Sequence, residues 1–387
     1  MKKILQATLS LFASLLLVTS VWAEQGVTDT EILIGSNNDL SGPFSAFGGP
    51  AIKSAQLVFD KVNKAGGIHG RKIRFIVEDH AYSMPKAISG LNKLVNGDKV
   101  FAMLLTLGTS INIASFKLQD AKKIPNISPL SNGRQMDKPL SALHYTAFAS
   151  YYSQIVAGVD YIAKEKKVTK ICSMYLPTDY GKEIKEGSLK ASEVEGRSFI
   201  AETTHKPDET DFVGALQKLN KAGCQIITMA LTVRQAISVI ATAKKLGIQN
   251  MSFLNSSAGF HSPMAKVPGG VTEGLYAAAG GSDILSRLDN PTVKEFFKEY
   301  TEKTGEKFPG TGAIYGYSGA TTVVNALKAA GKDLTTASFQ KAMESLNYRD
   351  EISDSHVSYS ASDHQGADDI VVSIVENGAW KEVARTK

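Results

Sequence analysis

The sequence has few of the residues on which metal and redox chemistry depend. It contains two cysteines and seven histidines among 387 residues, and the histidines are scattered. No Cys/His spacing suits zinc, and neither a P-loop nor a His-Glu-x-x-His motif occurs. His356 and His364 share a segment with several aspartates, for which a solvated acidic loop is the favoured interpretation over a cation site. We therefore expect no metal and no cofactor.

Long apolar runs are also rare, and the one that occurs lies at the N-terminus. Lys2 and Lys3 precede an apolar run over residues 4–21, which is followed by Trp22 and Ala23. This order is typical of a secretory signal peptide, and we predict that residues 1–23 are removed by cleavage after Ala23. The polar residues within the run argue against a membrane anchor, and the absence of cysteine at the cleavage point argues against a lipid anchor. No later stretch is long enough to span a bilayer, so we expect a periplasmic protein.

Charge of one sign is not in excess. Without Lys2 and Lys3 the chain carries 41 basic and 38 acidic residues, which is a net charge of +3. No long basic run occurs, and this near balance argues against a nucleic-acid partner.

The two cysteines, Cys172 and Cys224, each stand at the start of an expected strand. An exported chain can join such a pair in a disulfide. A cysteine buried in a strand is nevertheless often a small hydrophobic residue. We predict that the two are unpaired.

The segment from residue 32 to residue 80 sets the pattern of the chain. An apolar strand at 32–35 leads into a turn-rich loop, an amphipathic helix at 49–65 and a second strand at 72–77. Strand–helix–strand units of this kind build parallel sheets with helices on their faces. Because ligands bind beyond the C-terminal ends of such strands, the loop at 39–49 is a candidate site.

The same alternation of strands and helices restarts at Val168, so the chain is expected to form two lobes. The fold class is α/β, with two doubly wound parallel-sheet lobes. The Gly- and Ser-bearing stretch at 277–283 indicates a crossing between lobes, and helices that complete the first lobe come after it. A polar segment then leads to a final strand at 370–376. The expected division is 24–148 plus 280–355 for lobe 1 and 149–279 plus 356–387 for lobe 2, joined by three crossings.

The opening unit also carries a recognisable motif. Leu40-Ser41-Gly42 is followed by Gly48, and the helix ends in the run from Val62 to Arg71, Val-Asn-Lys-Ala-Gly-Gly-Ile-His-Gly-Arg. The chain thereby resembles the branched-chain (leucine/isoleucine/valine) amino acid binding family of type I periplasmic binding proteins, which are the soluble receptors of ABC importers. The resemblance covers essentially the whole mature chain. It implies a monomer whose two lobes close over a small-molecule solute and which docks on an inner-membrane permease.

The resemblance also implies which loops touch the ligand. Phe47 matches an aromatic position of the family, residues 108–110 match the loop that binds the ligand carboxylate, and Tyr180 matches the aromatic residue of the second lobe. A helix that begins at such a loop offers unpaired N–H groups to an anion. The expected ligand contacts are Phe47, Gly108, Thr109, Ser110, Leu130, Asn132 and Tyr180, with Tyr151, Tyr152 and Ser257 as further candidates.

Two departures from the family pattern bear on the ligand. The position that holds an acid in amino-acid binders falls within residues 255–257, which read Asn-Ser-Ser, and an expected aromatic position falls near Thr232. A buried ammonium without a carboxylate partner costs several kcal/mol, on the order of the usual desolvation penalty. We therefore expect a small carboxylate, an aromatic acid or an amide-type solute. The alternative is an amino acid whose ammonium pairs with Asp39, Asp179 or a shifted acid.

The cleft is expected to be rich in aromatic side chains and to have two cations nearby. The further aromatic candidates are Tyr82 and Phe260, and the cations are Arg134 and Arg234.

Other function classes have little support in the sequence. The glycines at 310, 312 and 316 resemble a dinucleotide fingerprint, but no strand precedes them and a helix is expected there. A possible nucleophile elbow at residues 316–319 lacks its last glycine. We therefore expect no catalytic residue and no enzyme activity, although an enzyme or a ligand sensor on the same scaffold remains an alternative.

Overall fold

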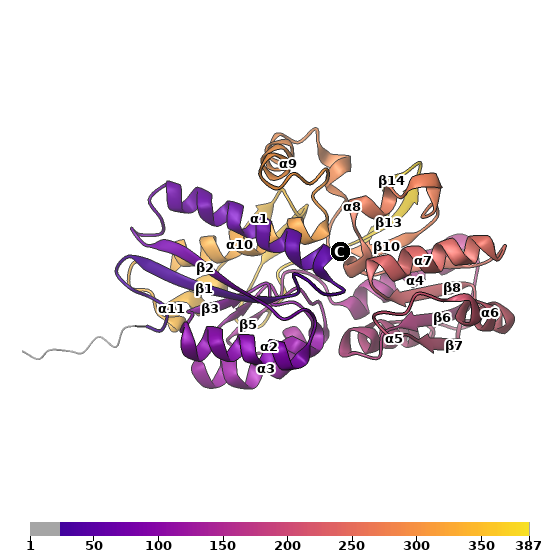
Figure 1. Ribbon diagram of the computed structural model, residues 1–387, viewed down its shortest axis with the longest axis horizontal. Coiled ribbons are helices and arrows are strands. Elements are labelled where there is room, and N and C mark those ends of the chain that lie inside the picture. The colour runs from indigo at the N-terminus through magenta and orange to yellow at the C-terminus, as the bar shows by residue number, and fades with distance from the viewer. Residues whose placement is uncertain (1–23, 387) are drawn as a thin grey trace, which may run out of the picture.

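The computed structural model describes residues 24–386, so the expected signal peptide lies outside the described residues. The described chain forms two α/β lobes that lie side by side along the long axis of the molecule (Figure 1). This arrangement confirms the predicted fold class. No helix of residues 24–386 is both long enough and apolar enough to cross a membrane.

The first lobe is built on a five-stranded parallel sheet in the order β2-β1-β3-β4-β5. Its strands are β1 (Glu31–Asn38), β2 (Lys72–Asp79), β3 (Ala102–Leu104), β4 (Asn126–Ile127) and β5 (His144–Tyr145). Its helices are α1 (Ser45–Lys64), α2 (Met84–Asn92), α3 (Thr109–Lys122), α9 (Pro291–Thr304), α10 (Thr311–Ala330) and α11 (Thr336–Met343). Helices α1 and α10 pack against each other along their length, whereas α2 and α3 cover the other side of the sheet (Figure 1).

The second lobe contains a seven-stranded sheet in the order β14-β13-β10-β9-β8-β6-β7. Its parallel strands are β6 (Lys170–Tyr175), β7 (Ser198–Thr204), β8 (Ile226–Ala230), β9 (Ser252–Asn255) and β10 (Tyr276–Ala279). The antiparallel strands β13 (Ile370–Glu376) and β14 (Ala379–Thr386) complete it. Its helices are α4 (Tyr151–Lys166), α5 (Asp179–Ala191), α6 (Val213–Ala222), α7 (Val233–Lys245) and the short α8 (Ser262–Ala265).

The start of one helix and the presence of three strands differ from the sequence-based expectation. Helix α1 begins at Ser45 rather than at residue 49. The segment expected to be polar and irregular contains a hairpin, β11 (Asn347–Asp350) and β12 (Ser355–Ser358), and the last strand β14 was not expected at all. These strands expose many charged side chains, so their apolar pattern is weak and pairing with a neighbouring strand defines them instead.

The prediction that the cysteines are unpaired is wrong. Cys172 and Cys224 form a disulfide, with their Cα atoms 5.9 Å apart and both side chains fully buried. Strands β6 and β8 are neighbours in the sheet although β7 lies between them in the sequence. This pairing brings the two cysteines within bonding reach, and spacing along the chain carries no sign of it.

We propose that the chain crosses between the lobes near Ser150, near Ser282 and before β13. Tyr359 and Ala367 still pack into the core of the first lobe, whereas Ile370 packs into that of the second. We therefore propose that the third crossing lies at residues 368–369, later than the sequence-based division places it.

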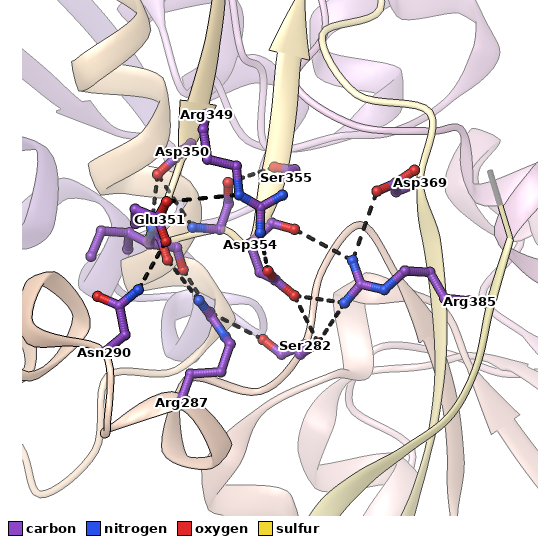
Figure 2. A network of polar contacts seen from close by, with 12 residues as sticks. Ser282, Arg287, Asn290, Arg349, Asp350, Glu351, Asp354, Ser355, Asp369 and Arg385 are labelled. Carbon is purple, nitrogen blue, oxygen red and sulfur yellow. Dashed lines mark hydrogen bonds and ion pairs between the residues drawn. The ribbon is translucent and has the colours of Figure 1, made fainter.

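A network of polar groups connects the lobes beside these crossings (Figure 2). The Asp354 carboxylate accepts hydrogen bonds from Ser282 Oγ at 3.0 Å and from Arg385 Nη2 at 2.6 Å, and it also pairs with Arg349. Asp354 belongs to the turn between β11 and β12, whereas Arg385 lies on β14 of the other lobe. Burial raises the pKa of Asp354, but the hydrogen bond and charge of Arg385 outweigh it and the net pKa lies below its ordinary value.

Replacing Asp354 tests this network. Asp354→Asn is expected to lower the free energy of unfolding by roughly 1–2 kcal/mol at pH 7, less than for a fully buried pair because the cluster is partly exposed. A carboxyl with a lowered folded-state pKa stabilises fully above its unfolded-state pKa of about 4, and the stabilisation is lost as the pH falls through the folded-state value. Wild type and variant should therefore begin to converge as the pH falls below about 4 and should coincide only below the folded-state pKa of Asp354, as measured by thermal unfolding across pH. The exposed Asp289 provides a control as Asp289→Asn; a gap that persists unchanged at low pH would contradict the assignment.

Candidate functional site

A cavity lies between the two lobes, at the C-terminal edge of the first sheet. About 360 Å³ of space that no atom fills lies between its walls, part of it open to solvent. The first lobe contributes seven of the lining residues and the second lobe three. They are Phe44, Phe47, Tyr82, Leu107, Gly108, Thr109 and Leu130 from the first lobe, and Tyr151, Tyr180 and Ala258 from the second.

The cavity brings together six of the ten expected ligand residues. These are Phe47, Gly108, Thr109, Leu130, Tyr151 and Tyr180. They come from five separate stretches of the chain that meet only because the lobes face each other.

One end of the cavity is formed by the start of helix α3. Gly108 precedes its first residue with a φ of +105°, a conformation that disfavours side chains, and no side chain caps the helix. The Thr109 hydroxyl lies 2.8 Å from Ser131 Oγ. Because the first N–H groups of a helix have no acceptor within it, this end offers donors and partial positive charge to an anion.

Three expected residues lie just beyond the lining. Asn132 Nδ2 donates to Ser257 Oγ at 3.3 Å, which joins the lobes behind the cavity. Ser110 Oγ accepts a hydrogen bond from the backbone N–H of Asp179 at 3.3 Å, again across the cleft. These residues help to hold the lobes together and do not line the cavity.

Tyr152 is placed elsewhere. Its ring lies 4.0 Å from the guanidinium carbon of Arg134, on the outer side of α4. Arg134 also bonds to Glu183, a fully buried carboxylate of α5, at 3.1 Å. Arg134 is therefore engaged in an ion pair between the lobes and does not face the cavity.

The cavity is walled by aromatic rings. Tyr82 lies 4.5 Å from Phe44, and Tyr151 lies 5.0 Å from Tyr180, between ring centroids. Burial raises the pKa of Tyr180 to about 12 and that of Tyr151 well above its ordinary value. Both phenols are thus neutral hydrogen-bond donors at physiological pH.

No residue lining the cavity within the described chain is acidic. Asp39 is fully buried, but its two oxygens accept the N–H groups of Gly42 and Phe44 at 2.5 and 2.9 Å. Asp179 pairs with Lys182 at 3.0 Å. Neither of the acids considered from the sequence contributes to the cavity wall.

Sequence reasoning missed Phe44, Leu107 and Ala258, and it placed Phe260 wrongly. Phe44 was assigned to a loop because the helix start was placed four residues late, although its spacing of three from Phe47 is a helical signal. Phe260 packs against Trp380 at 4.9 Å inside the second lobe. Leu107 and Ala258 are small or apolar and carry no signal in the sequence.

A further polar group lies behind the cavity. The Tyr315 hydroxyl of α10 is buried, has no well-aligned hydrogen-bond partner in the described chain, and lies near Asn132 and Ser257. Burial raises its pKa to about 12. Phe47 contacts its ring edge-on at 5.8 Å.

A protein-family model described as "Periplasmic binding protein" matches residues 31–379. The chain belongs to this family. It is a type I periplasmic binding protein, the substrate-binding component of an ABC transporter, which binds a small molecule and works with a membrane permease.

Relatives and solved structures agree with this assignment. The chain is 25% identical to "Leu/Ile/Val-binding protein homolog 1" of Brucella suis biovar 1 (strain 1330) over 86% of each chain. Its fold is similar to a fatty acid ABC transporter substrate-binding protein from Thermomonospora curvata, with a TM-score of 0.84, 24% identity and 93% coverage of both chains. It is also similar to a solute binding protein from R. palustris in complex with benzoate, with a TM-score of 0.81, 16% identity and coverage of 92% and 96%.

Proposed function

We propose that this binding protein captures a small monocarboxylate with an apolar or aromatic body and delivers it, as a monomer, to its permease. The observation that carries this proposal is the composition of the cavity. An uncapped helix start provides donors at one end, aromatic rings surround the remaining space, and no acid lines it.

Each part of the wall suits one part of such a ligand. A carboxylate accepts hydrogen bonds from the N–H groups at the start of α3 and from the Thr109 hydroxyl. The rings of Phe44, Phe47, Tyr151 and Tyr180 then contact its apolar body. The ammonium group of an amino acid would have no carboxylate partner in the cavity, at a cost of several kcal/mol by the usual order of magnitude.

The names of the relatives support the carboxylate and leave the rest of the ligand open. Leucine, isoleucine, valine, fatty acids and benzoate all carry a carboxylate. Only the first three also carry an ammonium. The absence of an acidic residue from the cavity wall therefore favours a carboxylate without an ammonium group, such as a fatty acid or benzoate.

Ligand capture follows from hinge closure. The cavity exists only where both lobes contribute walls, so a ligand contacts Tyr151 and Tyr180 of the second lobe fully only in the closed form. Binding energy gained only in that form shifts the open–closed equilibrium. The contact between Asn132 and Ser257 marks the closed arrangement.

The ligand class is tested with matched compounds. Leucine and 4-methylpentanoate share the carboxylate and the side chain and differ only in the ammonium group; benzoate and benzamide differ in the charge of the polar end. We expect 4-methylpentanoate and benzoate to raise the unfolding temperature most, because both carry a carboxylate and lack an ammonium group. A ligand present at a hundred times its Kd stabilises the folded protein by about 2.7 kcal/mol. A large shift with leucine alone would overturn the proposal and favour the alternative of an amino-acid binding protein. A large shift with benzamide alone would replace the carboxylate by an amide.

The Thr109 hydroxyl is expected to contribute directly. Thr109→Ala should raise the Kd of the best carboxylate by roughly ten- to a hundredfold, since one hydrogen bond to a charged group is lost. Thr109→Ser should retain most of the affinity. Ser115→Ala on the same helix is a control, because its hydroxyl bonds to the Ile111 carbonyl away from the cavity. An unchanged Kd in Thr109→Ala, measured by calorimetry, would remove Thr109 from the site.

A further inference from the structure

Phe44 reaches from the first lobe towards the second. Its ring centroid lies 4.5 Å from that of Tyr82 and 6.4 Å, edge-on, from that of Tyr180 across the cleft. It packs against the hydrophobic cores of both lobes while remaining half-buried. No other residue of the described cavity wall contacts the cores on both sides in this way.

The backbone fixes this position without help from a ligand. Asp39 accepts the N–H groups of Gly42 and Phe44, as described above. Asp79, on the neighbouring strand, accepts Leu40 N–H at 2.9 Å and the Ser41 hydroxyl at 2.6 Å. Two carboxylates therefore anchor the loop on both sides, so Phe44 is a preformed part of the wall.

A second space begins on the other side of this loop. A groove of about 780 Å³ between the lobes is lined by the chain neighbours of Phe44 and by polar residues of the second lobe. Its walls are Gly42, Pro43, Ser45 and Ala46 from the first lobe and residues 207–210, 232–235 and 238 from the second. Phe44 itself lines the inner cavity instead.

The Phe44 ring lines the cavity and the chain neighbours of Phe44 line the groove, so Phe44 lies where the two spaces approach each other. The Tyr82 ring adjoins both Phe44 and Gly108, because its centroid lies 4.5 Å from that of Phe44 and a Cβ at Gly108 would be 3.2 Å from the ring. Starting from the helix end that offers donors, the wall runs from Gly108 past Tyr82 to Phe44 and then to the groove. A ligand whose carboxylate is held at α3 would meet the Phe44 ring with its far end.

We propose that Phe44 limits the length of the ligand. Its ring closes the aromatic cavity against the groove, so that the site accepts compact acids and rejects those with longer chains. Removing the ring joins the cavity to the groove and admits a longer body. This inference rests on the proposed binding of monocarboxylates and adds a length limit to it.

The test uses straight-chain monocarboxylates from butanoate to dodecanoate, titrated by calorimetry into wild type and Phe44→Ala. We expect the affinity of wild type to fall once the acid exceeds a certain chain length. In Phe44→Ala, this fall should begin at a longer acid. The Kd of decanoate divided by the Kd of hexanoate should be at least tenfold lower in Phe44→Ala than in wild type. In Phe44→Leu this ratio should decrease by a smaller factor. Phe199→Ala is the matched control, because Phe199 is a half-buried phenylalanine of β7 outside the cavity. An unchanged ratio in Phe44→Ala would overturn the length limit.

The failure of the ligand class can be told from the failure of the length limit. If wild type binds leucine and none of the acids, the carboxylate proposal is overturned. The same comparison is then made with valine and phenylalanine, and a ratio that Phe44→Ala leaves unchanged overturns the length limit as well. If wild type binds members of neither series, both proposals are overturned.

Discussion

Removal of the disulfide between Cys172 and Cys224 is expected to lower the free energy of unfolding by about 4 kcal/mol. The bond closes a loop between residues 52 apart in sequence, and restricting a loop of that size in the unfolded chain is worth about this much in the chain-entropy model. For a chain of this size the unfolding temperature should fall by roughly 5 °C. Denaturant unfolding of wild type and of the double variant Cys172→Ala/Cys224→Ala measures the effect.

Wild type unfolded and refolded with a reductant present is the matched control. It keeps both sulfur atoms in the core, so the difference between its oxidised and reduced forms isolates the bond from the loss of buried volume. The same unfolding midpoint with and without the bond would contradict the prediction. Free thiols detected by alkylation of the unfolded, unreduced protein would contradict the disulfide itself.

Gly316→Ala is expected to produce the second largest loss. A Cβ atom at Gly316 would lie 2.0 Å from the Ala51 carbonyl oxygen of α1, and one at Gly312 would lie 2.1 Å from the Phe47 carbonyl oxygen. These are backbone atoms and cannot rotate away, so α1 and α10 must move apart. We expect a loss of about 3 kcal/mol from this overpacking, measured by denaturant unfolding.

A helical glycine without such a neighbour separates packing from helix propensity. Gly214 in α6 is exposed and has no atom within 4 Å of its would-be Cβ. Gly214→Ala should therefore stabilise the protein by about 0.5–1 kcal/mol, as expected from helix propensity alone. A Gly316→Ala variant as stable as wild type would show that the helices can separate without cost.

Gly312→Ala should disturb binding as well as stability. Its contact with the Phe47 backbone places it directly behind a residue of the cavity wall. Gly312 and Gly316, two of the three glycines that resemble a dinucleotide fingerprint, thus have a packing role, and both lie in a helix, as the sequence predicts. Two helices can approach each other this closely only where a residue without a large side chain, such as glycine, lies at the contact.

The candidate site was predictable where a local pattern exists. Gly108 and Thr109 follow a buried strand and open a helix, and the aromatic Phe47 and Tyr180 stand in the first turns of α1 and α5, the helices that follow β1 and β6. Position along the chain is enough for such residues, because the C-terminal ends of parallel strands meet at one edge. Phe44 has only its spacing of three from Phe47 as a signal, and a helix that starts four residues earlier than expected changes which side chains face the cleft.

Tyr152 is the opposite case, a residue that is expected to contact the ligand but lies outside the cavity. It follows Tyr151 at the start of α4, and adjacent residues of a helix point about 100° apart. Only one of the two can face the cavity, and the sequence does not say which. The structure places Tyr151 in the wall and Tyr152 under Arg134.

The sequence by itself determined the α/β class, the two repeats of strand and helix, and the family, because apolar periodicity and turn residues are local properties. It also showed that residues 255–257 hold no acid. The tertiary structure alone decided which cysteines meet, which aromatic rings line the cavity and which glycines let α1 and α10 touch. These features depend on strand order, helix rotation and the approach of the two lobes, which bring together residues far apart in the chain.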